Sequence, residues 1–298
     1  MNVTIIGLGL IGGSVGSRIL ETAWASEVVG VDDKPVNLHK AAELGLISDT
    51  SDFNDAIKVA DLVVMAIPVD KIADLLPEVL DAIKPGAVVV DMGSTKGSIC
   101  ESVEHHANRS AFVASHPIAG TENSGPSAAF ASLFDNKTGI LCDVNKSTDH
   151  AVRLVKDLYR ILGMRVIEMD SHAHDMHIAY VSHLSHISSF VLGQTVLEIE
   201  QDQKSIFDMA GSGFASTVRL AKSSPEMWAS IFSENKEHIS KSLDFYINNL
   251  LAFKSFIDEN KKAELYDTMK RTNEIRRVLD GIDIKHSTPQ KDQEKIGV

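Results

Sequence analysis

Up to about residue 168, the chain alternates short apolar runs with stretches of helical periodicity. The apolar runs are rich in β-branched residues, and polar turns separate them from the helical stretches. Strands that are apolar throughout are typical of a parallel sheet covered by helices on both faces. The pattern therefore predicts a doubly wound α/β domain. The expected strands are Asn2–Ile6, Glu27–Val31, Asp61–Ile67, Ala87–Asp91, Ala111–Ala114 and Arg165–Glu168, and the expected helices are Ile11–Thr22, Pro35–Leu44, Asp70–Ile83, Lys96–His105 and Thr148–Leu162.

The strand signal stops at Asp170, and helical patterns then run to about Asp280. This change predicts an α/β domain over residues 1–169, an all-helical domain over residues 170–284 and a disordered tail over residues 285–298, where apolar residues are scarce. The helix that begins near His172 is apolar on nearly every side, which indicates burial from all directions, as at the centre of a two-subunit bundle. In the first domain, Asn136–Asp143 is expected to form a hairpin, because it contains turn-forming pairs.

Charge and composition exclude several classes of protein. The 298 residues include 29 basic and 41 acidic side chains, for a formal net charge of −12. This excess opposes binding to nucleic acid or to an anionic membrane, because both depend on clustered Lys and Arg. The two cysteines, Cys100 and Cys142, provide neither a disulfide framework nor a cysteine-rich zinc site. With no leader pattern and no apolar run long enough to span a bilayer, we expect a cytoplasmic protein that binds small molecules or other protein chains.

A glycine-rich turn lies between the first strand and the first helix. Gly7 permits a tight turn, Gly9 lets the backbone approach a pyrophosphate, and Gly12 lets the helix pack closely on the strand. Leu10 and Ile11 stand between them, at the positive N-terminus of the helix, where a pyrophosphate is stabilised. In this strand–turn–helix context the motif predicts a dinucleotide site, although three glycines also suit a purely structural turn.

The ends of the following strands add to the dinucleotide site. Asp32 ends the second strand about twenty residues after Gly12, where a carboxylate binds the ribose hydroxyls and repels a 2′-phosphate. The sequence therefore predicts NAD rather than NADP, with Lys34 leaving NADP open. Ala66, Pro68 and Ser94 follow later strands, and the carboxyl ends of parallel strands line the ligand crevice. A surface turn for Asp32 and a simple strand stop at Pro68 are the structural alternatives.

His116 follows the next strand and is expected at the same edge of the sheet, beside the nicotinamide. A histidine there can accept a hydroxyl proton while hydride leaves the same carbon, because its ordinary pKa is near neutrality. Ser94, at the end of the neighbouring strand, is expected to orient the ring. The alternative is a structural histidine.

The helical domain contains several histidines and one well-placed arginine. At about 100° per residue, His174 and His177 share one helical face while His183 and His186 share another, so they do not form one metal site. We expect His174 and His177 to be polar residues of a helix end, and His183 and His186 to line a polar pocket. Arg219 follows a glycine break and suits the capture of a carboxylate, which in an acidic chain needs local donors.

Five motifs, in this order, make the chain similar to the prephenate/arogenate dehydrogenase family. They are Gly7-Leu-Gly-Leu-Ile-Gly-Gly-Ser14, Asp91-Met-Gly-Ser-Thr-Lys-Gly97, His116-Pro-Ile-Ala-Gly-Thr-Glu122, Ser182-His-Leu-Ser-His186 and Gly211-Ser-Gly-Phe214 followed by Arg219. The resemblance implies an N-terminal Rossmann domain, a helical domain that forms a homodimer by intertwining, and an active site between them. It implies that His116 is catalytic with Ser94 as its partner, that His183 and His186 contact substrate, that Arg219 holds the ring carboxylate, and that Glu122 stands at the entrance.

The implied reaction is the NAD-dependent oxidative decarboxylation of prephenate to 4-hydroxyphenylpyruvate and CO2, without a metal. The sequence departs from the family pattern in two places. Ser185 stands where proline is common, and Ala215 and Ser216 replace a common Arg-Asp pair, which removes an acidic partner near Arg219.

Three alternative functions stay open at this point. Arogenate dehydrogenase differs only in whether the substrate side chain carries an amine or a ketone. A β-hydroxyacid dehydrogenase uses a catalytic lysine in its helical domain, and the helix of His183 has none. A nicotinamide sensor without turnover would need neither His116 nor Arg219.

Overall fold

The computed structural model describes residues 1–201 and 205–287, without the side chains of residues 282–287. Most of the predicted tail, residues 288–298, lies outside the described residues. The chain forms two compact units, Met1–Ile239 and Ser240–Val298. At the predicted domain boundary near Asp170 the strands end and the helices begin, and both lie inside the first unit. The domain boundary itself stays a prediction.

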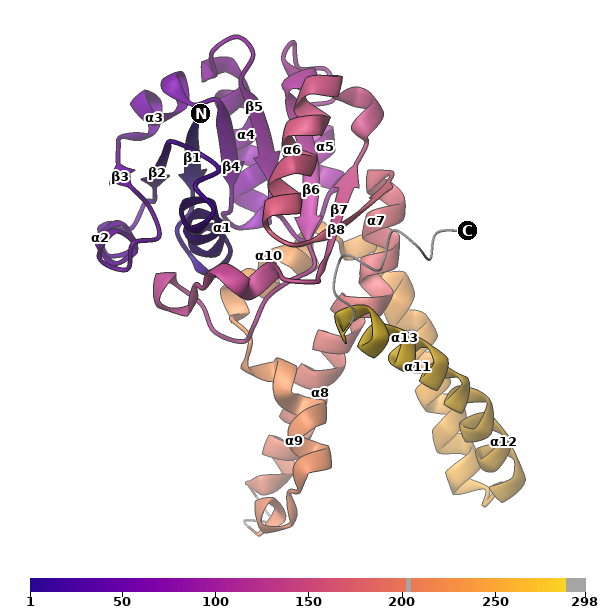
Figure 1. Ribbon diagram of the computed structural model, residues 1–298. Coiled ribbons are helices and arrows are strands. Elements are labelled where there is room, and N and C mark those ends of the chain that lie inside the picture. Colours follow the sequence, from indigo (N-terminus) through magenta and orange to yellow (C-terminus); the bar gives the residue numbers. More distant parts are fainter. Residues whose placement is uncertain (202–204, 288–298) are drawn as a thin grey trace. The chain divides into compact units, whose positions relative to one another are not determined.

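The first unit contains an eight-stranded sheet in the order β3-β2-β1-β4-β5-β6-β7-β8 (Figure 1). Neighbouring strands are parallel except β6 and β7, which are antiparallel. The strands are β1 (Asn2–Ile6), β2 (Glu27–Val31), β3 (Asp49–Thr50), β4 (Leu62–Met65), β5 (Val88–Asp91), β6 (Phe112–Pro117), β7 (Thr138–Cys142) and β8 (Arg165–Met169).

Helices cover both faces of this sheet. One hydrophobic core lies under α1 (Leu10–Glu21) and α6 (Asp149–Ile161), and a second lies under α3 (Phe53–Val59), α4 (Val69–Ala82) and α5 (Gly97–Ser102). The helix α2 (Pro35–Glu43) contributes Ala41 to the first core. The predicted doubly wound architecture is therefore confirmed, while the short elements β3 and α3 were not expected. The carboxyl ends of β1, β4 and β5 meet at one edge, which positions the glycine turn and the loops that follow β4 and β5.

The predicted hairpin at Asn136–Asp143 is wrong. The segment forms one strand, β7, which lies between β6 and β8 and has a buried Ile140–Cys142 run. Asn136 does adopt a turn conformation, with φ of 60°. Gly139, however, serves packing rather than a turn, because a Cβ there would lie 2.1 Å from the ring of Tyr159. Burial between two neighbouring strands outweighs the local turn preference.

The rest of the first unit is helical. Its elements are α7 (Ser171–Ile178), the π-helical η5 (Ala179–His183), α8 (Leu184–Glu200), η6 (Ile206–Met209), α9 (Ser212–Val218), η7 (Arg219–Lys222), α10 (Pro225–Glu234) and the start of α11 (Lys236–Asp258). Trp228 and Ile231 of α10 join the core beneath α4. The second unit holds the rest of α11, α12 (Lys262–Thr272), η8 (Asn273–Ile275) and α13 (Arg276–Ser287), so residues 285–287 of the predicted tail are helical.

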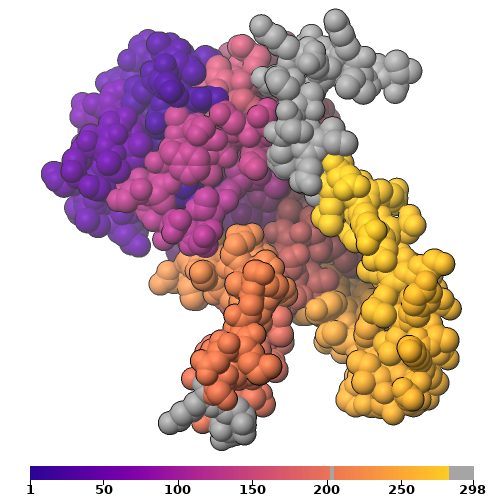
Figure 2. All heavy atoms as spheres, turned by 60° about the horizontal axis from the view of Figure 1, so that its bottom comes forward, coloured from indigo at the N-terminus to yellow at the C-terminus, as the bar shows by residue number. Residues whose placement is uncertain are grey.

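The distal part of α8 is largely exposed in the single chain. Val191, Leu197 and Ile199 are 53%, 57% and 49% exposed. Figure 2 shows the segment around α9, in orange, protruding from the body of the first unit. The expected all-round burial of this helix is therefore not achieved within one chain.

Of the helices in the described part of the chain, none is both long and apolar enough to cross a membrane.

Candidate active site

The glycine turn combines two crowded positions with one open position. Gly7 has φ of +93° and donates its N–H to Val31 O at 2.8 Å, and a Cβ there would lie 2.5 Å from Ala66 O. At Gly12 a Cβ would lie 1.9 Å from Gly7 O, so only glycine lets α1 approach β1 this closely. At Gly9 a Cβ would meet nothing within 4 Å. The turn therefore leaves open space at Gly9, directly before the helix.

The N-terminus of α1 offers free backbone donors. Gly9 is the N-cap and has no side chain to bind them, and the first bond into the helix runs from Gly13 N to Gly9 O at 2.9 Å. The N–H groups of Leu10, Ile11 and Gly12 therefore have no acceptor within the helix. Together with the helix dipole, they form a site suited to a phosphate anion.

Asp32 lies beside this turn at the end of β2. Its Oδ2 accepts from Leu8 N at 2.8 Å, and its Oδ1 accepts from Lys34 N at 2.9 Å and from Asn37 Nδ2 at 3.0 Å. A carboxylate has about four lone-pair positions, so Oδ2 retains one for a ribose hydroxyl. The carboxylate thus fixes the loop geometry and still fits the predicted contact with the ribose.

Ala66, Pro68 and Ser94 follow β4 and β5 at the same edge of the sheet. Ala66 donates its N–H to Ile6 O at 2.7 Å, exposed Pro68 is the N-cap of α4, and Ser94 is half-buried. The edge along which the predicted nucleotide would lie is therefore built from small side chains.

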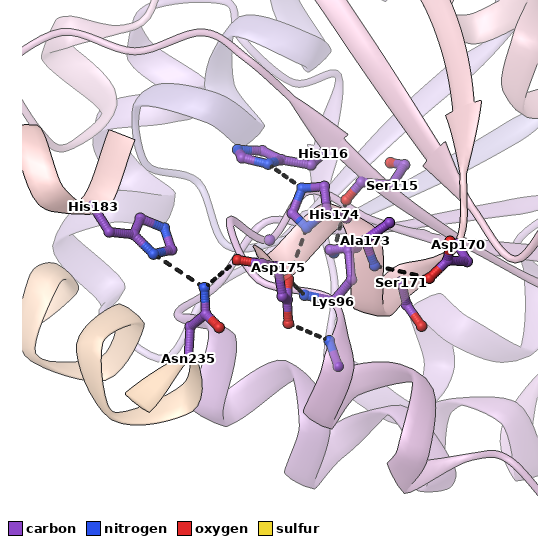
Figure 3. Close-up of polar contacts among 12 residues, drawn as sticks. Lys96, Ser115, His116, Asp170, Ser171, Ala173, His174, Asp175, His183 and Asn235 are labelled. Atoms are coloured by element: carbon purple, nitrogen blue, oxygen red, sulfur yellow. Dashed lines mark hydrogen bonds and ion pairs between the residues drawn. The ribbon is translucent and has the colours of Figure 1, made fainter. Parts of the chain in front are cut away.

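His116 is the next-to-last residue of β6 and is only 8% exposed. Its Nδ1 lies 2.8 Å from Nε2 of His174, and Nδ1 of His174 lies 2.7 Å from Oδ1 of Asp175 (Figure 3). Burial, reinforced by the neighbouring His174 and Lys96, holds the pKa of His116 well below its ordinary value. His116 is therefore neutral at neutral pH and able to accept a proton. In the described part of the chain its ring bonds to His174 and makes no hydrogen bond to Ser94.

Asp175 is the centre of this arrangement. Its Oδ1 and Oδ2 accept from the backbone N–H groups of Lys96 and Gly97 at 2.8 and 2.7 Å. Burial alone would raise the pKa of Asp175, but the hydrogen bonds from His174, Gly97 and Lys96 outweigh it and lower the pKa. The carboxylate is therefore ionised and accepts hydrogen bonds only.

A buried ion pair supports the loop that carries Ser94. The side chains of Lys96 and Asp91 are both fully buried and paired, and Lys96 Nζ also donates to Ser115 O at 2.8 Å. Tyr159 donates its hydroxyl to Ser115 Oγ at 2.7 Å. Breaking a buried ion pair from one side leaves an uncompensated charge, so these groups hold the ends of β5 and β6 in place.

His183 and His186 meet at the indole ring of Trp228. The ring of His186 stacks on it at 3.5 Å, and the ring of His183 meets it edge-on at 5.8 Å. Nδ1 of His183 lies 3.2 Å from Nδ2 of Asn235, while its buried Nε2 has no partner among the described residues. Burial lowers the pKa of His183 to about 4 and also lowers the pKa of His186. Both rings are therefore neutral at neutral pH.

Arg219 and Glu122 form a loose ion pair at 3.7 Å, with side chains 56% and 39% exposed. An exposed pair of this kind contributes only ~0–1 kcal/mol, so Arg219 is available to another carboxylate. Positive charge on Arg219 also lowers the pKa of His186, after burial and against the opposing hydrogen bond to Ser182 O. The first unit thus brings Arg219, Glu122 and His186 to one place. Ala215 and Ser216, where the family pattern has Arg-Asp, are exposed.

Sequence reasoning missed three residues of this site, Lys96, His174 and Asn235. The expectation that His174 is a polar helix-end residue is wrong, since it is 1% exposed and central to the site, whereas His177 is exposed as expected. Helical periodicity could not pair His174 with Asp175, because neighbours in sequence point in different directions. A usable signal was Asp170, whose side chain accepts from Ala173 N at 2.8 Å as an N-cap and fixes where the helix begins.

The described residues contain no group of three or more His, Cys, Asp or Glu side chains arranged to hold a metal ion.

Comparisons with known proteins show the family to which the chain belongs. Residues 15–168 match the family model for the prephenate dehydrogenase nucleotide-binding domain, and residues 170–271 match that for the prephenate dehydrogenase dimerization domain. The chain is 30% identical to the cyclohexadienyl dehydrogenase of Zymomonas mobilis, over 93% of this chain and 96% of that protein. It is 29% identical to the prephenate dehydrogenase of Bacillus subtilis, over 95% of this chain and 76% of that protein.

A solved structure is similarly close. The prephenate dehydrogenase from A. aeolicus, in complex with hydroxyphenyl propionate and NAD+, is 30% identical, with a TM-score of 0.86 over 94% of this chain and 98% of that chain. Because the two domain models together match most of the sequence and these relatives extend over nearly all of it, the chain belongs to the prephenate dehydrogenase family.

Proposed function

We propose that this protein is an NAD-dependent dehydrogenase that converts prephenate to 4-hydroxyphenylpyruvate and CO2. The observation that carries this proposal is the state of His116, a neutral, buried imidazole at the carboxyl end of β6 with Nδ1 engaged by His174. Its other nitrogen, Nε2, has no hydrogen-bond partner in the described residues and is available to a substrate. The prephenate dehydrogenase from A. aeolicus was solved with a hydroxyphenyl acid and NAD+, and a hydroxyphenyl acid resembles the expected product.

The glycine turn fits NAD as the cofactor. The open position at Gly9, the unpaired N–H groups of Leu10 and Ile11, and the remaining lone pair of Asp32 match a pyrophosphate followed by a ribose. When bound, NAD accepts a hydride. The negative charge of Asp32 opposes a 2′-phosphate, and exposed Lys34 is the nearest feature in sequence that would favour one.

His116 acts as the general base. It takes the proton of the ring hydroxyl while the carbon that bears this hydroxyl loses a hydride, and a well-placed base of this kind contributes about 10²–10⁴-fold to the rate. The ring carboxylate then leaves as CO2, and its bonding electrons complete the aromatic ring. Aromatisation makes the overall step effectively irreversible.

Arg219, His183 and His186 bind and orient the anionic substrate. Arg219 binds a substrate carboxylate more strongly than it binds Glu122, because a bidentate, partly desolvated pair is stronger than an exposed one. Holding the carboxylate that departs would oppose the loss of its electrons, so Arg219 contributes to positioning rather than to the chemical step. Ser94 lies at the same edge and is assigned to the nicotinamide side of His116.

The assembly is a homodimer formed by the helical domain, residues 170–284. Two findings support this proposal: the exposed apolar side chains of α8, and the match of residues 170–271 to a dimerization domain. Mass measurement by light scattering, at a concentration well above that of an activity assay, tests it.

A paired assay tests the proposed function. Purified protein is given prephenate or arogenate, each with NAD or NADP, and formation of the reduced cofactor is followed by absorbance. We expect the highest kcat/KM with prephenate and NAD. Turnover of arogenate but not of prephenate would make the protein an arogenate dehydrogenase, and turnover of neither would refute the proposal.

A further inference from the structure

One residue, Asp175, is hydrogen-bonded through both its side chain and its main chain to groups that lead to the site histidines. The carboxylate contacts His174, whose other nitrogen contacts His116. The main-chain carbonyl accepts from Asn235 Nδ2 at 2.8 Å, and the same nitrogen lies 3.2 Å from His183 Nδ1. Figure 3 shows both routes leading away from Asp175. All five residues lie in the first compact unit.

The first route determines which nitrogen of His116 carries the proton. Asp175 can only accept, so Nδ1 of His174 carries its proton and donates it to the carboxylate. In a neutral His174, Nε2 then has a lone pair and accepts from Nδ1–H of His116. This leaves the lone pair of His116 on Nε2, the nitrogen that has no protein partner. A carboxylate that orients an imidazole for base catalysis works in this way in hydrolytic triads, here with a second imidazole inserted.

The second route gives His183 the opposite polarity. The amide of Asn235 must direct its NH₂ group at the carbonyl of Asp175, because its own oxygen would repel that carbonyl. The same NH₂ group donates to Nδ1 of His183, so the ring proton is on Nε2. That N–H is buried with no protein acceptor in the described part of the chain, which leaves it available to an acceptor on a bound ligand.

We propose that Asp175 and its two relay residues, His174 and Asn235, set the tautomers of the site histidines in opposite senses. His116 presents a lone pair to the substrate hydroxyl, and His183 presents an N–H to an acceptor oxygen of the substrate, of carboxylate or carbonyl type. His174 and Asn235 are positioning residues, and the assignment rests on the proposed function for the identity of the substrate. When His116 takes the substrate proton, the ionised Asp175 stabilises the resulting cation through His174.

Side-chain NMR tests the tautomers without any turnover. Protein labelled with ¹⁵N-histidine is studied by long-range ¹H–¹⁵N correlation, and the signals are assigned with His116→Gln and His183→Gln. We expect His116 to be protonated on Nδ1 and His183 on Nε2. A His116 ring protonated on Nε2 in the neutral form would overturn the proposal. If the protein fails to oxidise prephenate, this result still stands or falls by itself.

Kinetics test the first route with a graded pair of variants. In His174→Gln the side-chain carbonyl can still accept from His116, whereas in His174→Leu nothing can. We expect His174→Leu to lower kcat about 100-fold, at the lower end of what general-base catalysis contributes, with KM for prephenate nearly unchanged. His174→Gln should recover at least a tenth of the wild-type kcat. Equal losses in the two variants, or an effect on KM alone, would contradict the relay.

Two more variants separate the routes. Asp175→Asn removes the negative charge that stabilises protonated His116 through His174, and its NH₂ group must oppose either the backbone N–H of Gly97 or the donors at Oδ1, so we expect a loss of kcat at least as large as in His174→Leu. Asn235→Leu breaks only the second route, so it should raise KM for prephenate and leave kcat within about threefold. His177→Leu, at an exposed position on the same helix as His174, is the matched control and should change neither constant. A kcat defect in Asn235→Leu as large as that in His174→Leu would overturn the assignment of separate roles.

Discussion

Arg219 is held loosely, and this looseness suits a residue that must exchange partners. Its contact with Glu122 is long and solvent-exposed, so releasing it costs little. We predict that Arg219→Ala raises KM for prephenate about 10- to 100-fold, the value of a lost charged hydrogen bond, with a smaller effect on kcat. Lys222→Ala removes the same charge from a neighbouring exposed position and should leave KM unchanged. Equal KM values for wild type and Arg219→Ala would remove this arginine from the substrate site.

The roles of residues in a local sequence motif were predictable, whereas the roles of residues that act through another side chain were not. Gly7, Gly12 and Asp32 occupy the predicted places because strand–turn–helix geometry is local in sequence. His174 bonds to a residue 58 positions away, and the sequence contains no pattern that pairs them. Asn235 meets Asp175 across 60 positions in the same way. Contacts of this kind depend on how elements pack, so only the structure identifies them.

At the scale of elements, the glycine turn separates a packing role from a binding role. Gly12→Ala would place a methyl group 1.9 Å from Gly7 O and push α1 away from β1. We predict a loss of about 1–3 kcal/mol in the free energy of unfolding, as for other overpacked sites. Chemical denaturation of the variant and the wild type measures it, and an unchanged stability would show that the helix can shift freely.

Gly9→Ala is the complementary variant. Its backbone conformation suits any residue and the Cβ position is open, so the stability of the fold should not change. The methyl group enters the space that the pyrophosphate needs, and we predict an NAD dissociation constant raised about tenfold or more, which corresponds to ~1.4 kcal/mol. Calorimetric titration with NAD tests this prediction. Wild-type affinity in Gly9→Ala would place the pyrophosphate elsewhere.

The π-helical turn η5 interrupts the regular helix that carries His183 and His186. A regular wheel at about 100° per residue assumes 3.6 residues per turn, and the π-turn over Ala179–His183 breaks that count. His183 and His186 were expected to line a common pocket. Both rings do meet at Trp228, with His183 buried and His186 half-buried.

At the scale of the whole molecule, neutral buried histidines make stability depend on pH. His183 has a folded-state pKa of about 4, whereas an exposed histidine titrates near ~6.5. Below pH ~6.5 the unfolded chain therefore binds a proton that the folded chain excludes, so this contribution is complete above that pH and is lost as the pH falls toward 4. The lowered pKa of His116 acts in the same direction.

We predict that His183 alone lowers the free energy of unfolding by roughly 2 kcal/mol between pH 7 and pH 5. In His183→Gln this part of the decrease should disappear, while the remaining pH dependence stays. Denaturant titrations of both proteins at the two pH values, at one protein concentration, measure the difference. The same decrease in the variant as in the wild type would show that His183 titrates normally.

The architecture was predictable at this scale because it follows from local periodicity. Apolar β-branched runs and amphipathic helices fixed the α/β class, and the change in pattern near Asp170 indicated where strands end. The strand β7 was not predicted: it pairs antiparallel with β6, and its Gly139 packs against the ring of Tyr159, a contact that local periodicity does not reveal. The second compact unit begins inside α11, at Ser240, where the sequence shows no break.

In the proposed reaction, His116 initiates an oxidation that is coupled to decarboxylation. The most direct measurement follows NADH by absorbance and CO2 release from carboxyl-labelled prephenate in the same reaction, for the wild type and for His116→Asn. We expect one CO2 for each NADH in the wild type, and a kcat about 10²–10⁴-fold lower in His116→Asn with unchanged NAD affinity. NADH formed without CO2, or full activity in His116→Asn, would contradict it.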